Sequence, residues 1–105
     1  MNKEFRLIGK AVRQEDWRAA FVLARDDEGR ILMQLRDSHE GVAAPGKWCI
    51  FGREVEEGED LGAAACREFH EETGITLMRA ELTPLARFAS SSRPNGMIYA
   101  FATSR

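Results

Sequence analysis

The sequence predicts a single α/β domain, an α+β sandwich of one helix and a sheet, on three observations. Its 105 residues, 44% of them hydrophobic, are enough for one core and too few for two. The stretch 61–73 has the pattern of a helix that buries one face. Apolar runs typical of strands lie on both sides of it. Because no repeat or linker divides the chain, residues 1–105 are expected to form one domain.

The first half of the chain contains the clearest strand signals. The stretch 19–37 (AAFVLARDDEGRILMQLRD) has two apolar runs joined by DDEG, the composition of a turn, and predicts a β-hairpin. A loop is expected over 38–47, followed by a short strand at 48–51 (WCIF). The charged stretch 53–59 (REVEEGE), broken by a glycine, predicts a further loop.

The helix has a start signal and a stop signal. Asp60 is a good N-cap for a helix from about Leu61 to Thr73, and Gly74 stands where a left-handed C-terminal cap is common. After the helix, strands are expected at 75–82 (ITLMRAEL), at 85–90 and at 97–103.

Composition excludes several classes of function. The formal net charge is -2, from 15 basic and 17 acidic residues, so the chain lacks the strongly basic character of proteins that coat nucleic acids. Cys49 and Cys66 lack the spacing of metal ligands and are expected to be reduced thiols. No apolar run approaches the roughly 20 residues that span a bilayer, and 1–10 lacks the apolar core of a secretory signal. A cytoplasmic protein without membrane contact is therefore expected.

Two phosphate- or calcium-binding motifs are also disfavoured. The stretch 41–47 (GVAAPGK) has the glycine and lysine spacing of a P-loop, but Trp48 replaces the required Ser or Thr and a strand follows in place of a helix. The acidic stretches DDEG and EEGED fail the EF-hand pattern because Ala24 or Arg53 would occupy its first ligand position. We expect a loop with a turn at Pro45-Gly46 and no calcium loop.

Three carboxylates crowd one face of the predicted helix. Glu68, Glu71 and Glu72 fall within an arc of about 100°, where like charges three and four positions apart repel. Arg67 is the only basic neighbour in this stretch. The crowding indicates that a cation belongs on this face.

The whole stretch 53–75 resembles the Nudix box of the Nudix hydrolase family. The matching residues are Glu59, Arg67, Glu68, Phe69, Glu71, Glu72, Gly74 and Ile75. At ordinary residue frequencies the four glutamates, the arginine and the glycine of this set coincide by chance with a probability on the order of 10⁻⁷ per window. The preceding stretch 30–52 is also similar to family members. The resemblance implies a mixed sheet of the Nudix type, with the box forming a loop, a helix and a loop.

The resemblance implies a divalent cation, Mg²⁺ with Mn²⁺ as an alternative. Glu68 and Glu72 are then the direct ligands, and Glu71 is a ligand or a base that activates water. Arg53 replaces the first glycine of the box, whose main-chain carbonyl binds the metal in the family. Any residue has such a carbonyl, so Arg53 can still supply this ligand.

The resemblance also implies catalytic and substrate-binding residues. Arg67 should pair with Glu59 and hold the preceding loop against the helix, and both are assigned to the catalytic set with Glu71. The side chain of Arg53 either binds a substrate phosphate or obstructs the site. Arg36 and Trp48 are further candidates for substrate binding, although Trp48 could instead pack at the start of its strand.

The implied activity is Mg²⁺-dependent hydrolysis of a phosphoanhydride bond in a nucleoside diphosphate linked to another group. The alternative is a catalytically silent module that binds a nucleotide or a protein partner. Arg53 favours this alternative. So does the lack of any acidic residue after Glu81, because many family members draw a further carboxylate from beyond the box.

The end of the chain leads to a prediction about assembly. The sequence stops at Arg105, soon after the strand-like stretch 97–103, and is expected to lack the final elements of the family fold. An uncovered strand edge at 97–103, or the edge beside it, would pair with another chain, which predicts a homodimer or a strand-exchanged oligomer.

Overall fold

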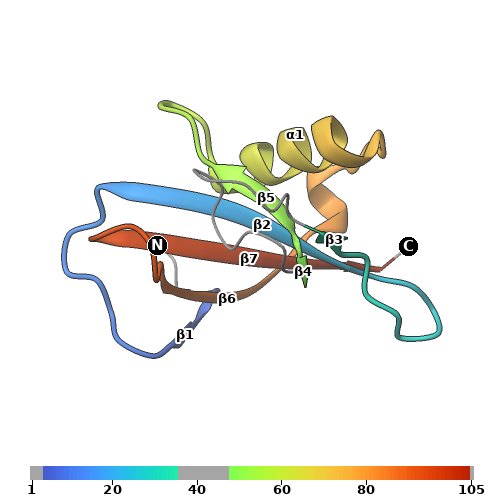
Figure 1. Cartoon of the computed structure of the whole chain (residues 1–105). Coiled ribbons are helices and arrows are strands. Elements are labelled where there is room, and N and C mark those ends of the chain that lie inside the picture. The colour runs from blue at the N-terminus through green and yellow to red at the C-terminus, as the bar shows by residue number, and fades with distance from the viewer. Residues whose placement is uncertain (1–3, 36–47, 105) are drawn as a thin grey trace.

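The computed structural model of the chain describes residues 4–35 and 48–104. Its elements follow one another along the chain as Figure 1 shows. They are β1 (Arg6–Ile8), β2 (Trp17–Arg25), β3 (Gln34–Leu35), β4 (Trp48–Cys49), β5 (Phe51–Glu54), α1 (Leu61–Thr73), the 3-10 helix η1 (Arg79–Glu81), β6 (Thr83–Ala89) and β7 (Gly96–Ser104).

A five-stranded mixed sheet forms the base of the fold. The strand order is β1-β6-β7-β2-β5, in which β1 with β6 and β2 with β7 run parallel and the other neighbours run antiparallel. Strands β3 and β4 form a separate two-stranded sheet. Helix α1 lies across one face of the large sheet (Figure 1), where it contacts β2 and β5. The predicted α+β class with a mixed sheet is confirmed.

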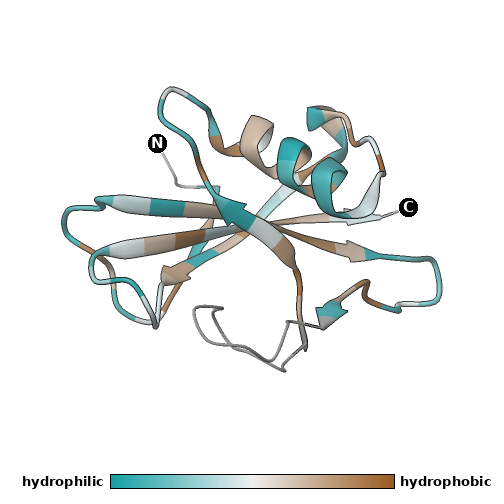
Figure 2. Cartoon of the chain, turned by 45° about the horizontal axis from the view of Figure 1, so that its top comes forward, coloured by the Kyte–Doolittle hydropathy of each residue, from teal (hydrophilic) through white to brown (hydrophobic). Residues whose placement is uncertain are grey.

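The core lies between α1 and the sheet. The side chains of Val22, Phe69, Met97 and Tyr99 are the largest that are fully buried there. Phe69 meets Phe51 of β5 edge to face, with ring centroids 5.8 Å apart, so the helix is packed directly on the strand that precedes the charged loop. In Figure 2 the first turn of α1 is apolar and the following turns are hydrophilic. The acidic residues thus sit on a helix whose other face is anchored in the core.

Both ends of α1 form as predicted. The carboxylate of Asp60 accepts a hydrogen bond from the N–H of Ala63 at 2.7 Å, which satisfies one of the free donors of the first turn. Gly74 has a φ of 79° and donates its N–H to the carbonyl of His70 at 2.8 Å. The left-handed conformation favours glycine at this position.

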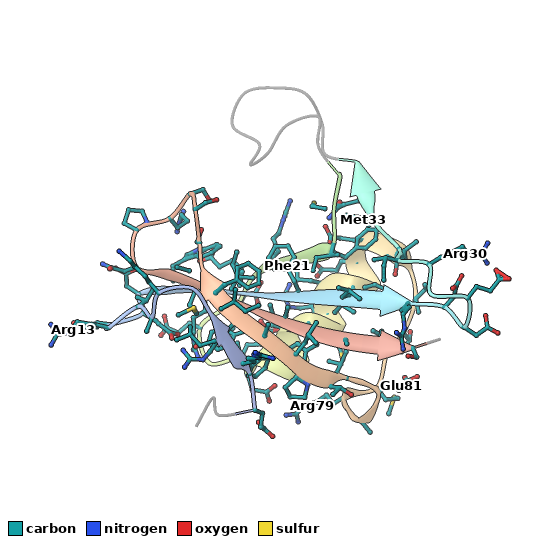
Figure 3. All side chains as sticks on the ribbon, turned by 90° about the horizontal axis from the view of Figure 1, so that it is seen from below. Arg13, Phe21, Arg30, Met33, Arg79 and Glu81 are labelled. Carbon is teal, nitrogen blue, oxygen red and sulfur yellow. The ribbon has the colours of Figure 1, made fainter. Side chains whose placement is uncertain are left out.

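The hairpin predicted over 19–37 is only partly correct. The turn forms, because the Asp26 carboxylate accepts from the N–H groups of Glu28 and Arg30 at 2.9 and 2.8 Å (Figure 3 labels Arg30). Beyond the turn, however, a single bridge joins Arg25 to Ile31, and β3 pairs with β4 instead of β2. Strand β5 occupies the same edge of β2 at Ala19 to Val22, so the returning chain cannot pair there.

The strand predicted at 75–82 does not form. Leu77 is buried, whereas Ile75 and Met78 are exposed, so the segment lacks the regular alternation of a strand that packs on a core. The chain instead turns through η1, where the Glu81 carboxylate accepts from the N–H of Met78 at 2.8 Å. The predicted strands at 85–90 and 97–103 correspond to β6 and β7.

Strand β7 is central, which corrects the predicted open edge at 97–103. It is hydrogen-bonded to β2 on one side and to β6 on the other. Its residues Met97, Tyr99 and Phe101 are buried in the core, where the ring of Phe5 packs edge to face on Tyr99 and Phe101. The homodimer remains a prediction, but these residues offer no edge for it.

The two cysteines and the lengths of the helices bear on two further expectations. Cys49 and Cys66 are free and half-buried, as predicted. Within 4–35 and 48–104, no helix is long and apolar enough to cross a membrane.

A buried tyrosine fastens the segment between β1 and β2 to the sheet. The hydroxyl of Tyr99 donates to the Glu15 carboxylate, with both oxygens at 2.7 Å. Tyr99→Phe should therefore lower the free energy of unfolding by about 1–2 kcal/mol, the loss of a hydrogen bond to a charged group. Urea unfolding at pH 7 measures this difference.

The same contact predicts a pH dependence. Burial, and then the bond to Glu15, raise the pKa of Tyr99 to about 12. Because the folded pKa lies above the usual value of 10.0, the stabilisation is complete below pH 10 and is lost as the pH rises toward 12. Tyr99 is the only tyrosine in the sequence, so absorbance titration reads it directly. An ordinary titration near pH 10 in the folded protein would contradict the contact.

Candidate metal and catalytic site on helix α1

Helix α1, strand β5 and the loop between them enclose an open cleft of about 430 Å³. The helix contributes Arg67, Glu68 and Glu71, and the strand and loop contribute Arg53 and Glu56. The edge-to-face contact between Phe51 and Phe69 packs the two elements against each other. The cleft therefore lies where sequence analysis placed the cation.

Arg67 is shared by several carboxylates. Its Nε and Nη2 donate to the two oxygens of Glu59 at 2.7 and 2.9 Å, and its Nη1 donates to Oε2 of Glu68 at 2.6 Å. The same Nη1 lies 3.5 Å from Glu71 and 3.7 Å from Glu56. The pairing with Glu59 predicted from the sequence is present, and this one guanidinium offsets much of the repulsion among the acidic residues.

The Arg67–Glu59 pair also closes the loop before the helix. Oε1 of Glu59 accepts from the N–H of Glu56 at 3.0 Å, so the side chain bridges the loop backbone and the helix. The hydrogen bond to Arg67 lowers the pKa of Glu59, and the bond to Glu59 raises the pKa of Arg67. Both groups are thus held in their charged forms.

The three helix carboxylates have different environments. Glu68 is 5% exposed and is oriented by Arg67. The side chain of Glu71 is 56% exposed. Glu72 is half-buried, and this burial raises the pKa of its carboxyl. The hydrogen bond from Gln34 lowers that pKa, and the negative charge of Glu68 raises it, so the net shift is upward. A half-buried carboxylate that the fold discourages from ionising is typical of a functional site.

Two groups that sequence analysis missed hold Glu72. The N–H of Gly52 donates to Oε1 at 3.1 Å, and Nε2 of Gln34 lies 3.5 Å from Oε2. A Cβ on Gly52 would overlap the carbonyl oxygen of Ala20 and lie 2.6 Å from Cγ of Phe21, so only glycine lets β5 approach β2 this closely. The glycine just before Arg53 was the available signal in the sequence.

The donor set fits a hard divalent cation by its chemistry. Carboxylate oxygens are the ligands that Mg²⁺ and Mn²⁺ prefer, and Glu68 and Glu72 lie one turn apart on α1. In the described part of the chain, however, no three His, Cys, Asp or Glu side chains are already gathered closely enough to hold a metal ion. Arg67 orients Glu68, whereas Gly52 and Gln34 orient Glu72, so cation binding requires the Glu68 side chain to move away from Arg67 toward Glu72.

A family model for the NUDIX domain matches residues 16–104. The chain belongs to the NUDIX domain family. Among curated proteins it is 40% identical over 62 residues to the nucleoside triphosphatase NudI of Escherichia coli K12, a match that covers 59% of this chain and 43% of NudI. The chain thus spans less than half the length of the curated relatives it matches.

Solved structures of NUDIX proteins have the same fold. A MutT/nudix family protein from Listeria innocua superposes with a TM-score of 0.70 at 25% identity, over 89% of this chain and 67% of that protein. A bifunctional NMN adenylyltransferase/ADP ribose pyrophosphatase from Francisella tularensis, complexed with AMP and a Mn ion, superposes with a TM-score of 0.66 at 22% identity, over 90% and 29%.

Arg53 is the one departure from the NUDIX box and lies on the cleft side of β5. It pairs with Ala20 of β2 in the sheet register, and its side chain is exposed. Within the described residues its guanidinium forms no hydrogen bond or ion pair, although its charge acts on Glu72. A cation in this cleft that has no partner among residues 4–35 and 48–104 can bind an anionic ligand.

The remaining substrate-binding candidates could not be placed. Arg36 lies outside the described residues. Trp48 belongs to β4, but its side chain lies outside the described part. Their assignment to the NUDIX substrate site remains a prediction.

Proposed function

We propose that this NUDIX domain hydrolyses a phosphoanhydride bond in a nucleoside diphosphate linked to another group, with Mg²⁺ or Mn²⁺ as cofactor. The observation that carries the proposal is the acidic face of α1, where Glu68 and Glu71 line the cleft and Glu72 lies beside them against the N–H of Gly52. Such an acidic face favours binding of a divalent cation, and a bound cation would attract the phosphate oxygens of a pyrophosphate.

Each residue then has a defined task. Glu68 and Glu72 would hold the cation, together with the main-chain carbonyl of Arg53. When bound, the cation supplies neutralisation of charge on the phosphate oxygens. Glu71, which is exposed at the cleft, accepts the proton of the attacking water or completes the cation site. The Arg53 side chain binds a non-bridging phosphate oxygen.

The relatives support this reaction class and leave the substrate open. NudI is named a nucleoside triphosphatase, and ADP ribose pyrophosphatase is one of the two activities named for the bifunctional Francisella protein. Both names describe cleavage of a phosphoanhydride on a nucleotide. The two substrates differ in what lies beyond the pyrophosphate, so the leaving group must be measured.

A substrate panel tests the proposal. Nucleoside triphosphates, dinucleoside polyphosphates and nucleotide sugars are each incubated with Mg²⁺, with Mn²⁺ and with EDTA, and phosphate products are quantified. We expect cation-dependent turnover of at least one member. Binding of a nucleotide without turnover of any member would instead support the catalytically silent module. Two observations favour that alternative: Arg53 in the cleft, and the lack of three acidic side chains grouped closely enough to hold a metal ion among the described residues.

The role of Arg53 gives a separate prediction. If its guanidinium binds a phosphate, Arg53→Ala should raise KM roughly 5- to 30-fold with a smaller change in kcat, the loss of about 1–2 kcal/mol of charge-assisted contact. Arg25→Ala is the matched control, because Arg25 is also exposed at the edge of the fold and forms no ion pair among the described residues. A rise in kcat/KM for Arg53→Ala or Arg53→Gly would show that the arginine obstructs the site.

A further inference from the structure

The Glu72 carboxylate is oriented by two segments far from it in sequence. Gly52 and Gln34, which lie 20 and 38 residues away, contact its two oxygens separately. By contrast, Glu71 is largely exposed, and in the described part of the chain its side chain has one long contact, to Arg67 at 3.5 Å. Of the two adjacent carboxylates, Glu72 is the one whose orientation the fold controls.

The two contacting groups belong to one connected unit. Gln34 lies in β3 and pairs with Cys49 of β4, and β4 is followed after one residue by β5, which contains Gly52. Gln34 is half-buried. The small sheet and the edge strand of the large sheet therefore present a main-chain donor and a side-chain donor to the same carboxylate.

A glutamine is chemically suited to orient a ligand without competing for it. Its amide must turn Nε2 toward the carboxylate, because two oxygens facing each other would repel. The neutral amide uses one lone pair of Oε2 and adds no positive charge. Arg67, which holds Glu68, does add a full charge. The remaining lone pairs of Glu72 stay available to a cation.

We infer that Gln34 is a positioning residue for Glu72: with the N–H of Gly52, it fixes the carboxylate in the orientation in which Glu72 binds the divalent cation. The inference rests on the proposed function, in which Glu72 is a cation ligand. Partners behind a metal ligand commonly change metal affinity 10- to 100-fold. A single neutral donor at 3.5 Å should have a smaller effect, about three- to tenfold.

The test measures Mn²⁺ binding to the metal-free protein by electron paramagnetic resonance. Gln34→Met keeps the volume of the side chain and removes the donor. Its Kd for Mn²⁺ should rise three- to tenfold, while Tm in EDTA stays within about 2 °C of the wild type, a difference that a structural role would exceed. Gln14→Met, at an exposed glutamine before β2, is the control and should bind Mn²⁺ like the wild type.

A double mutant separates this inference from the proposed function. In the Glu72→Gln background, Gln34→Met should cause no further weakening, because the two residues act through one ligand. The role of Gln34 is overturned if Gln34→Met leaves the Kd for Mn²⁺ unchanged, or if it weakens Mn²⁺ binding as much in the Glu72→Gln background as in the wild type. It is also overturned if Gln34→Met lowers the Tm in EDTA by more than about 2 °C. If Glu72→Gln alone binds Mn²⁺ like the wild type, the assignment of Glu72 as a ligand fails as well.

Discussion

Glu72→Gln should remove most of the cation affinity and lower kcat by at least about 100-fold, since charge stabilisation by a bound metal ion is worth several kcal/mol. The same variant should raise the Tm of the metal-free protein. Burial raises the pKa of Glu72, so the fold disfavours the charged form, and a neutral amide keeps an acceptor for the N–H of Gly52. A residue that costs stability and is required for activity is typical of a functional site.

The sign of the pH dependence follows from that shift. A group whose folded pKa is raised contributes stability at low pH, and the contribution is lost as the pH rises through the folded pKa. The gain in Tm from Glu72→Gln, measured in EDTA, should therefore be larger at pH 8 than at pH 4. Glu4→Gln, at an exposed glutamate that does not line the cleft, is the control and should change neither Tm nor cation affinity. Equal heats of Mn²⁺ binding for the wild type and Glu72→Gln would remove Glu72 from the site.

Sequence reasoning succeeded where the structure depends on residues close together in the chain. The cap residues Asp60 and Gly74 act within one helical turn of the ends they define, so their signals are local. The Arg67–Glu59 pair spans only eight residues. Its geometry follows from a short loop that folds back on the first turns of α1.

Sequence reasoning failed where segments that are distant in the chain compete to pair with the same strand. The second arm of the predicted hairpin has the composition of a strand that pairs with β2, but β5 pairs with that edge of β2 instead. The residues between 19 and 37 contain no signal of this competition. The central place of β7 likewise depends on β2 and β6, which flank it from opposite parts of the chain. Gln34 and Gly52 approach Glu72 only as a consequence of this arrangement.

Arg67→Met should destabilise the fold more than the removal of any other charged side chain at the site. Glu68 is 5% exposed, and Glu59 is tied to Arg67 through both oxygens, so removal of the guanidinium leaves two partly buried carboxylates facing each other. Breaking a buried ion pair costs roughly 3–5 kcal/mol, and partial exposure of Arg67 reduces this to about 2–4 kcal/mol. Urea unfolding at pH 7 measures the loss, and turnover should fall with it because the loop is released from the helix.

The destabilisation should also depend on pH and on the type of ion pair removed. The bond to Arg67 lowers the pKa of Glu59 below its ordinary value of 4.5, so the stabilisation is present above that pH and is lost as the pH falls. The gap between the wild type and Arg67→Met should therefore narrow in acid. Arg30→Met removes exposed pairs with Asp26 and Glu28 and should cost less than about 1 kcal/mol. If the two arginine variants lose equal stability at pH 7, the Arg67 network is only a surface ion pair and does not organise the site.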